Sequence, residues 1–268
     1  MKSIKSKRAF VTGAASGIGR CLCELLAREG AILYISDINE EQLKKFADEL
    51  ISNGADVTYF AYDVSDFEAV KSAAEETLSK GDLDILVNNA GIGYSNDLAD
   101  TPIDVWKRLV DVNFFGPIYH INAFLESMRN AKRGQIVNVS SGQAFFKLPG
   151  WGAYASVKAA LGVYSEILYY ELKKYGITVT TIYPFMVNTP FYREIEGETW
   201  GAKLSMKLVP YYSMKPETVA RIILKAIKQE KRVEKVSIFN KIGFYSQVVP
   251  FAQDIIATTS ALLLTKRK

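Results

Sequence analysis

Tyr154 and Lys158 stand four residues apart in the segment Tyr154-Ala155-Ser156-Val157-Lys158. On a helix this spacing puts both side chains on one face, although such pairs also occur on helix surfaces without a function. An unperturbed tyrosine has a pKa of about 10, and an adjacent ammonium favours its phenolate, so we expect Tyr154 to exchange a proton nearer neutral pH. Ser141 lies thirteen residues before Tyr154, and its hydroxyl is expected to hold a substrate oxygen during that exchange.

A glycine-rich turn lies near the start of the chain, in Thr12-Gly13-Ala14-Ala15-Ser16-Gly17-Ile18-Gly19. Gly13 permits a tight turn, Gly17 lets the backbone approach a pyrophosphate, and Gly19 lets the next helix pack closely on the sheet. The N-terminus of that helix offers free N–H groups to an anion. Because the glycines lie between a predicted strand and a predicted helix, they indicate a dinucleotide site with contacts from Gly13, Ser16, Gly17, Ile18 and Gly19.

Asp37 is expected to select the nucleotide. It directly follows the second predicted strand, 18 residues after Gly19 and near the usual spacing of about 20. A carboxylate there accepts hydrogen bonds from the ribose hydroxyls and repels a 2′-phosphate. The next residue is Ile38 rather than an arginine that could hold that phosphate. The sequence therefore favours NAD as cofactor, with NADP as the less favoured alternative.

These residues need a scaffold that brings distant segments together. Short apolar runs predict strands at 9–12, 31–36, 57–61, 83–87, 135–139, 177–182 and 235–239. Amphipathic stretches predict helices at 17–29, 40–52, 66–79, 102–128, 154–174 and 216–229. Strands separated by helices imply a parallel sheet with helices on both faces. The predicted fold is α/β, a Rossmann-type doubly wound parallel sheet in three α/β/α layers and a single domain, with ligands beyond the carboxyl ends of the strands.

Composition sets the broad class. The 268 residues are 49% hydrophobic and 23% charged, which suits a globular protein with a sizeable core and argues against disordered, collagen-like and disulfide-rich classes. The net charge of +4 is uneven, because residues 1–202 carry −5 and residues 203–241 carry +7. No basic-aromatic module accompanies the positive segment, so we expect no nucleic-acid partner.

Metal and disulfide chemistry are not expected. The chain has one histidine, His120, and its two cysteines, Cys21 and Cys23, lack metal-ligand spacing. Cysteines two apart on a helix point to different sides, which disfavours a disulfide between them. We see neither the long apolar segment of a signal peptide nor an apolar run long enough to span a bilayer. The expected location is the cytoplasm.

Several motifs follow one another in an order and spacing typical of one family: Thr12-Gly13-x-x-x-Gly17-Ile18-Gly19, Asp63-Val64, Asn88-Asn89-Ala90-Gly91, Asn113, Ser141, Tyr154-x-x-x-Lys158 and Pro184-x-x-Val187-x-Thr189. In these motifs the chain, from Arg8 to about Phe239, resembles the short-chain dehydrogenase/reductase (SDR) family. The resemblance implies hydride transfer between C4 of a nicotinamide and an alcohol carbon, with the cofactor carrying the difficult step.

The resemblance also implies a role for each matched residue. Tyr154 would donate or accept the proton, Lys158 would lower its pKa and hold the nicotinamide ribose, and Ser141 would orient the substrate oxygen. Asn113 would hold a water that links Lys158 to solvent. The other cofactor contacts would be Asp63 and Val64 at the adenine, Asn89, Ala90 and Gly91 at the adenosine ribose, and Val187 and Thr189, after Pro184, at the nicotinamide carboxamide.

One departure from the family pattern bears on the substrate: Phe185 stands where the family usually has glycine. Its ring either lines the substrate pocket or packs outward and stiffens the loop, and we expect the pocket. Trp151, Phe191 and Tyr192 are expected to join it, with Gln143 as a polar contact. This lining would suit an apolar alcohol or ketone, such as a lipid, steroid-like or aromatic one, unless the rings serve core or lid packing.

The chain divides into a predicted domain, 1–243, and a tail, 244–268. The domain includes a substrate lid at about 185–212. The tail is apolar, has Asp254 as its one acid and ends in Lys266-Arg267-Lys268. Subunit packing is the default interpretation of the tail, and peripheral membrane contact is the alternative. By analogy with the family, we expect a homodimer or homotetramer.

Three functions compete. The leading one is an NAD-dependent dehydrogenase of an apolar secondary alcohol, which also reduces the ketone. The second is an NADPH-dependent 3-oxoacyl reductase that uses its basic surface to meet an acidic carrier protein, but Asp37 and Ile38 speak against it. The third is a non-catalytic nucleotide-binding scaffold, which the intact set of Asn113, Ser141, Tyr154 and Lys158 disfavours.

Overall fold

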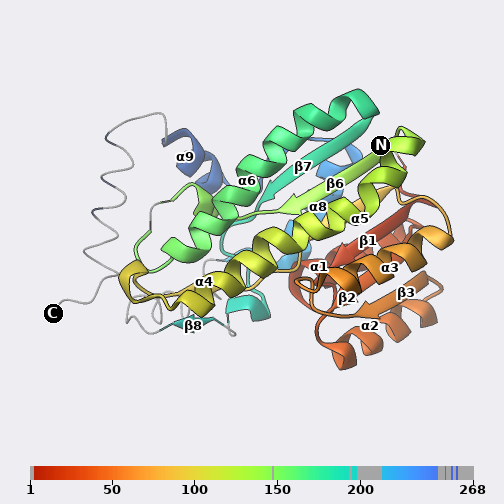
Figure 1. Cartoon of the computed structure of the whole chain (residues 1–268), viewed down its shortest axis with the longest axis horizontal. Coiled ribbons are helices and arrows are strands. Elements are labelled where there is room, and N and C mark those ends of the chain that lie inside the picture. Colours follow the sequence, from red (N-terminus) through yellow and green to blue (C-terminus); the bar gives the residue numbers. More distant parts are fainter. Residues whose placement is uncertain are drawn as a thin grey trace.

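The computed structural model describes residues 3–146, 148–192, 195–197 and 213–246, together with residues 251, 255 and 258. Its centre is a seven-stranded sheet, in which every recorded strand pair is parallel (Figure 1). Across the sheet the strands run in the order β3 (Asp56–Ala61), β2 (Ile32–Asp37), β1 (Arg8–Thr12), β4 (Ile85–Asn88), β6 (Gly134–Val139), β7 (Ile177–Tyr183) and β9 (Val233–Lys235). The order reverses between β1 and β4, and such a switch point is where doubly wound sheets bind ligands.

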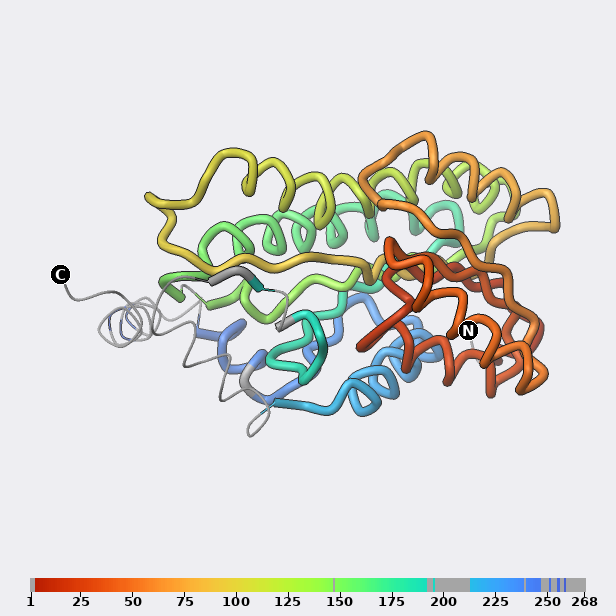
Figure 2. The backbone as a smooth tube through the Cα atoms, turned by 90° about the horizontal axis from the view of Figure 1, so that it is seen from below, coloured from red at the N-terminus to blue at the C-terminus, as the bar shows by residue number. Residues whose placement is uncertain are grey.

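Helices cover both faces of the sheet, so the expected three layers are confirmed. On one face lie α1 (Gly17–Arg28), α2 (Glu40–Ser52) and α8 (Pro216–Lys228). On the other lie α3 (Phe67–Ser79), α5 (Gly116–Ala131) and α6 (Gly152–Leu172). Figure 2 shows α5 and α6 above the sheet and α8 below it. Successive β1 side chains alternate between the two cores, since Ala9 and Val11 pack on the first side and Phe10 on the second.

Short elements lie at the ends of the strands and helices. β5 (Tyr94–Ser95) and β8 (Glu196–Gly197) form a separate two-stranded parallel pair. The 3-10 turns are Leu98–Asp100, Gly142–Ala144, Lys173–Tyr175 and Pro190–Tyr192.

The single helix predicted over 102–128 is wrong. The chain forms α4 (Ile103–Val110), then a π-helical turn (Asp111–Phe115), and then α5. Within this turn the side chain of Asn113 makes two hydrogen bonds with the backbone of Ile92. Periodicity along the chain does not reveal such a turn, because its partner is a distant loop.

The strand predicted over 235–239 is also wrong. β9 ends at Lys235, and residues Ile238–Ser246 form a helix, α9. A short apolar run does not separate a buried strand from a helix, which explains the error. The predicted boundary between residues 243 and 244 falls inside α9.

Candidate active site

A cleft of about 340 Å³ opens beyond the carboxyl ends of β1, β2, β3, β4, β6 and β7. All the predicted catalytic and cofactor residues line it except Gly19 and Asn113. Those that line it are Gly13, Ser16, Gly17, Ile18, Asp37, Asp63, Val64, Asn89, Ala90, Gly91, Ser141, Tyr154, Lys158, Pro184, Val187 and Thr189. Residues from six strand ends therefore meet at one site, as a parallel sheet requires.

The glycine turn is shaped by close approach. Gly13 has a φ of +65°, and a Cβ added to it would lie 2.8 Å from Cα of Ala90. A Cβ on Gly19 would collide with the carbonyl oxygen of Gly13. The first turn of α1 therefore sits directly on the end of β1, and Gly19 serves packing behind the cleft wall.

Thr12 and Asn89 join this turn to the loop after β4. The Thr12 hydroxyl oxygen accepts hydrogen bonds from the backbone N–H groups of Asn89 and Ala90, each 3.0 Å long. The Asn89 side chain donates to the carbonyl oxygens of Thr12 and Gly13, also at 3.0 Å. Asn89 thus braces the turn with its side chain, and contact with the adenosine ribose stays a prediction.

The Asp37 carboxylate is held at the mouth of the cleft by two backbone groups. Its Oδ2 accepts from Ala15 N at 3.0 Å, and its Oδ1 accepts from Asn39 N at 3.0 Å. An ionised carboxylate has about four acceptor sites, so it keeps capacity for further donors such as ribose hydroxyls. The neighbouring Ile38 is 65% exposed and brings no positive charge.

Arg108, which sequence reasoning missed, fixes Asp63. The Asp63 Oδ2 accepts from Nη2 of Arg108 at 2.7 Å, and its Oδ1 accepts from the backbone and hydroxyl of Ser65 at 2.9 and 2.6 Å. Burial raises the pKa of Asp63, but the hydrogen bonds from Arg108 and Ser65 outweigh it and hold that pKa below its usual value. Arg108 lies on α4, 45 residues along the chain, and no local signal marks it.

Ser141, Tyr154 and Lys158 come together at the inner end of the cleft, and all three are buried. Ser141 follows β6, and its hydroxyl oxygen accepts from the backbone of Gln143 at 3.2 Å. Tyr154 and Lys158 lie in the first two turns of α6, as their spacing predicts. The Lys158 ammonium donates to the carbonyl oxygen of Val139 at 3.1 Å.

Burial, rather than Lys158, dominates the titration of Tyr154. Burial raises the pKa of Tyr154 to about 12, although its hydrogen bond with Ser141 acts in the opposite direction. Burial lowers the pKa of Lys158 to about 8. The Lys158 Nζ bonds to Val139 and lies 5.9 Å from the centre of the Tyr154 ring. A lowering of the Tyr154 pKa by Lys158 stays a prediction.

Asn113 lies behind the cleft wall and is fully buried. Its Oδ1 accepts from Ile92 N at 3.2 Å, and its Nδ2 donates to Ile92 O at 3.0 Å. A Cβ added to Gly91 would lie 2.6 Å from that Oδ1 and 3.3 Å from the Nζ of Lys158. Asn113 and Lys158 therefore flank Gly91, and the water-holding role of Asn113 stays a prediction.

The five expected substrate residues divide. Phe191 lines the cleft, with its ring centre 5.7 Å from that of Tyr154, and Met186 lines it without having been expected. Trp151 is buried and packs on Tyr154 at 6.2 Å, outside the cleft lining. Gln143 is also buried outside that lining.

Phe185 does not line the cleft, contrary to the expectation. Its ring centre lies 5.1 Å from that of Phe146, and its side chain packs against Gly142. The aromatic partner on the loop after Ser141 draws the ring away from the cleft. The side chain of Tyr192, and residues 193–194 and 198–212 of the expected lid, lie outside the described residues.

Comparison with known proteins agrees with this architecture. The family model for short chain dehydrogenases matches residues 7–199. An uncharacterized oxidoreductase of Staphylococcus saprophyticus is 35% identical over 236 residues, which cover 87% of this chain and 96% of the relative. Cyclopentanol dehydrogenase of Comamonas testosteroni is 35% identical over 196 residues, or 73% of this chain and 78% of the relative. Among solved structures, a 3-oxoacyl-[acyl-carrier protein] reductase with bound NAD from Brucella melitensis has a TM-score of 0.75 at 28% identity and covers 88% of this chain and 90% of that chain.

Proposed function

Because the chain belongs to the short-chain dehydrogenase/reductase family of oxidoreductases, we propose that it transfers a hydride between NAD and an apolar secondary alcohol or the corresponding ketone. The observation that carries this proposal is the meeting of Ser141, Tyr154 and Lys158 at the inner end of the cleft that Asp37 borders. A proton-exchanging phenol, a hydroxyl and an ammonium in one cleft with a glycine turn are the groups that this reaction needs.

When bound, NAD would supply the acceptor for the hydride that leaves the alcohol carbon in oxidation. The phenolate oxygen of Tyr154 takes the hydroxyl proton as the C=O bond forms, and in reduction the phenol returns it. The Ser141 hydroxyl holds the same substrate oxygen and orients it toward Tyr154. Lys158, with a pKa of about 8, supplies positive charge beside the site near neutral pH and favours the phenolate.

NAD is the proposed cofactor because of Asp37. Its carboxylate is fixed by Ala15 and Asn39, and it is suited to ribose hydroxyls and repels a 2′-phosphate. The CH–OH donor is proposed to be apolar because Phe191 and Met186 line the cleft near Tyr154. The similarity to a cyclopentanol dehydrogenase supports an alicyclic or otherwise apolar alcohol.

A 3-oxoacyl reductase is the second candidate, and the similarity to the Brucella melitensis enzyme favours it. That structure contains NAD, so the substrate separates the two candidates more sharply than the cofactor does. Comparing NADH with NADPH, each with an acetoacetyl thioester and with cyclopentanone, distinguishes them. Preference for NADPH and the thioester would replace the first proposal with the second.

The test of the proposed reaction follows NADH absorbance with NAD and a panel of cyclic, steroid and long-chain secondary alcohols. For the best substrate, Tyr154→Phe should lower kcat by about 10³-fold and leave NADH binding unchanged. Tyr175→Phe, on the turn after α6, is the matched control and should keep full activity. Full turnover in Tyr154→Phe would refute the mechanism, and normal NAD binding without turnover on any substrate would favour the scaffold alternative.

We also propose that the protein works in the cytoplasm as a homodimer or homotetramer with a small-molecule substrate. Light scattering of the purified chain measures its subunit number. A monomer that keeps full activity would remove the oligomer from the proposal.

A further inference from the structure

The β3–α3 loop, residues 62–66, forms part of the cleft wall through Tyr62, Asp63 and Val64. The family resemblance predicts that this loop contacts the adenine of the cofactor. Helix α5 packs against the loop, because a Cβ added to Gly116, the first residue of α5, would lie 3.1 Å from a methyl carbon of Val64. Two further side chains, one from α5 and one from α4, hold the loop at its other positions.

His120, a buried residue of α5, holds Tyr62 at the start of the loop. Its Nδ1 lies 2.8 Å from the carbonyl oxygen of Gly116, which can only accept, so Nδ1 carries the proton. Burial lowers the pKa of His120 to about 4, so the ring is neutral at pH 7 and Nε2 is an acceptor. The Tyr62 hydroxyl therefore donates to Nε2, at 2.7 Å, and the two rings stack. This anchor does not involve Arg108.

Arg108, on α4, holds the middle of the loop with two donors. Its Nη2 donates to Oδ2 of Asp63 at 2.7 Å, and its Nη1 donates to the hydroxyl oxygen of Ser65 at 2.9 Å. A guanidinium cannot accept, so the Ser65 hydroxyl accepts from Arg108 and turns its own hydrogen toward Oδ1 of Asp63, at 2.6 Å. Arg108 therefore fixes both carboxylate oxygens, one directly and the other through Ser65.

These contacts leave the Asp63 carboxylate with one acceptor site, out of the four or so that an ionised carboxylate has. Among the described residues, Oδ1 accepts from the backbone N–H and the hydroxyl of Ser65, and Oδ2 accepts from Arg108. The remaining site belongs to Oδ2, and Asp63 lines the cleft. Although burial raises the pKa of Asp63, the hydrogen bonds from Arg108 and Ser65 hold that pKa below its usual value. The carboxylate is therefore an acceptor, and no donor, at neutral pH.

A single fixed acceptor distinguishes purine bases by the group at position 6. Adenine carries an amino group there, which donates hydrogen bonds. Hypoxanthine and guanine carry an oxygen there, which only accepts. An acceptor that meets a fixed carboxylate gains no hydrogen bond and is repelled, and sites built around a hydrogen bond reject analogues that cannot make it. The selection depends on the orientation of the carboxylate, because a carboxylate free to rotate could turn away from the oxygen.

We propose that Arg108 is a positioning residue that makes the cleft select a dinucleotide with a 6-aminopurine base. Arg108 acts through Asp63, because it holds the carboxylate in an orientation that leaves one acceptor site of Oδ2 for the amino group. The anchor between Tyr62 and His120 keeps the loop in place, so the loss of Arg108 frees the carboxylate rather than the whole loop. This inference rests on the proposed function, since it requires a nicotinamide dinucleotide in the cleft.

The test measures binding without turnover, by calorimetry of the full chain with NADH and with reduced nicotinamide hypoxanthine dinucleotide. The natural chain should bind NADH about tenfold more tightly than the hypoxanthine analogue. Arg108→Met, which keeps the length of the side chain and removes its donors, should lower this ratio by about threefold or more. Arg108→Lys keeps a charged donor and should restore part of the ratio. The matched control is Lys107→Met, an exposed position on the same helix, which should keep the natural ratio.

Asp63→Asn separates positioning from direct contact. In that background Arg108→Met should not lower the ratio further, because the acceptor through which Arg108 acts has gone. A further drop there would overturn the positioning role, as would equal weakening of both dinucleotides by Arg108→Met, or equal binding of both by the natural chain. These three outcomes leave the proposed function standing. A natural chain that does not bind NADH would refute the proposed function and this inference with it.

Discussion

Tyr154 is a protonated phenol at neutral pH, because burial raises its pKa to about 12. In this state it is ready to donate a proton to a ketone, whereas alcohol oxidation requires the phenolate. Lys158 is the nearby cation that can favour the phenolate, but its ammonium bonds to Val139 in this structure. The two directions of the reaction therefore have different dependences on pH.

We expect kcat/KM for alcohol oxidation to rise with pH, about tenfold per unit, until the pKa of the free-enzyme base is reached. Ketone reduction should be independent of pH below that value, because the phenol is already protonated. Initial rates in both directions at fixed ionic strength measure this. An oxidation rate that falls as pH rises would contradict the role given to Tyr154.

Asp37 offers a test of cofactor choice at the same scale. Asp37→Ala removes the carboxylate that is suited to ribose hydroxyls and repels a 2′-phosphate. The ratio of kcat/KM for NAD to that for NADP should therefore fall by about tenfold or more. Asp56→Ala, an exposed carboxylate at the start of β3, should leave the ratio unchanged. An unchanged ratio in Asp37→Ala would show that other groups select the cofactor.

At the scale of elements, the loop that carries Ser141 packs against α9. Phe145 and Phe146 follow the 3-10 turn after Ser141, and both contact α9. Phe146 also packs against Phe185 with tilted rings, so the segments after β6 and β7 share one aromatic support. Through these contacts α9 is coupled to the position of Ser141.

Gly243→Ala tests this support. The added Cβ would lie 2.5 Å from the Phe146 ring, and we expect a loss of about 1–3 kcal/mol in the free energy of unfolding. The double variant Gly243→Ala/Phe146→Leu should recover part of the loss, because the smaller side chain makes room. Ile242→Ala, on the exposed face of α9, is the control and should change stability little. Denaturant unfolding compares these three variants with the natural chain, and a loss that the added Phe146→Leu does not relieve would locate the strain elsewhere.

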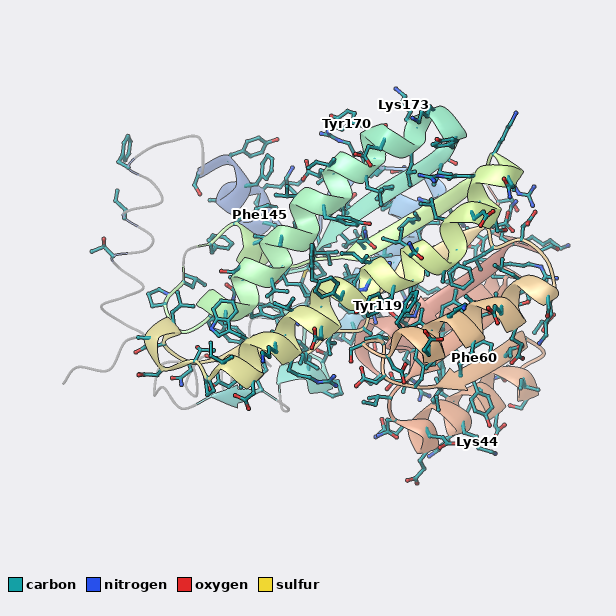
Figure 3. The ribbon with its side chains drawn as sticks, in the orientation of Figure 1. Lys44, Phe60, Tyr119, Phe145, Tyr170 and Lys173 are labelled. Atoms are coloured by element: carbon teal, nitrogen blue, oxygen red, sulfur yellow. The ribbon has the colours of Figure 1, made fainter. Side chains whose placement is uncertain are left out.

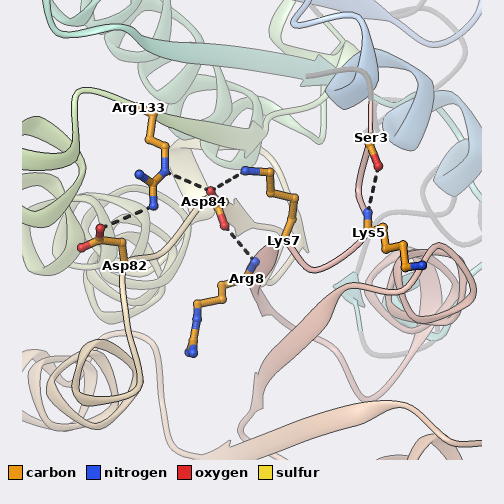
Figure 4. Close-up of polar contacts among 7 residues, drawn as sticks. All are labelled: Ser3, Lys5, Lys7, Arg8, Asp82, Asp84 and Arg133. Carbon is orange, nitrogen blue, oxygen red and sulfur yellow. Dashed lines mark hydrogen bonds and ion pairs between the residues drawn. The ribbon is translucent and has the colours of Figure 1, made fainter.

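At the scale of the whole molecule, the buried carboxylate of Asp84 links the N-terminal ends of the strands, on the side of the sheet away from the cleft. Asp84 accepts from Lys7 Nζ at 2.9 Å, from Arg8 N at 3.1 Å and from Arg133 Nε at 3.3 Å (Figure 4). Arg133 also pairs with Asp82 at 3.5 Å. These contacts join the starts of β1, β4 and β6. Figure 3 shows the side chains that these layers carry, from apolar rings such as Phe60 to charged groups such as Lys44 and Lys173.

The pKa of Asp84 predicts how stability depends on pH. Burial raises this pKa, but the hydrogen bonds from Lys7 and Arg8 outweigh it, so the folded-state pKa lies below the usual value. The stabilisation is therefore complete above the unfolded pKa of about 4 and is lost as pH falls through the folded pKa. Asp84→Asn should lose about 2 kcal/mol near pH 7 by urea unfolding. The difference from the natural chain should shrink in acid, and an equal difference at all pH values would contradict this account.

Most of the strands and helices along the chain, and most of the site, could be predicted from local pattern. Apolar runs of strand length, amphipathic helical stretches and a glycine turn between the first strand and helix are properties of neighbouring residues. Because carboxyl ends of parallel strands share one edge, residues that follow those strands had to gather there. That is why Gly13, Asp37, Ser141 and Tyr154 line one cleft.

Other features depend on contacts between residues far apart in the chain. Arg108 meets Asp63 across 45 residues, and Asn113 meets Ile92 through a π-helical turn that interrupts an otherwise regular helix. Phe185 packs against Phe146 rather than lining the cleft. Residues Ile238–Ser246 form the helix α9, and its inner face packs on the loop after Ser141. Packing partners decide the direction of a side chain, and they decide whether a short apolar run forms a strand or a helix. These partners come together only when the sheet assembles.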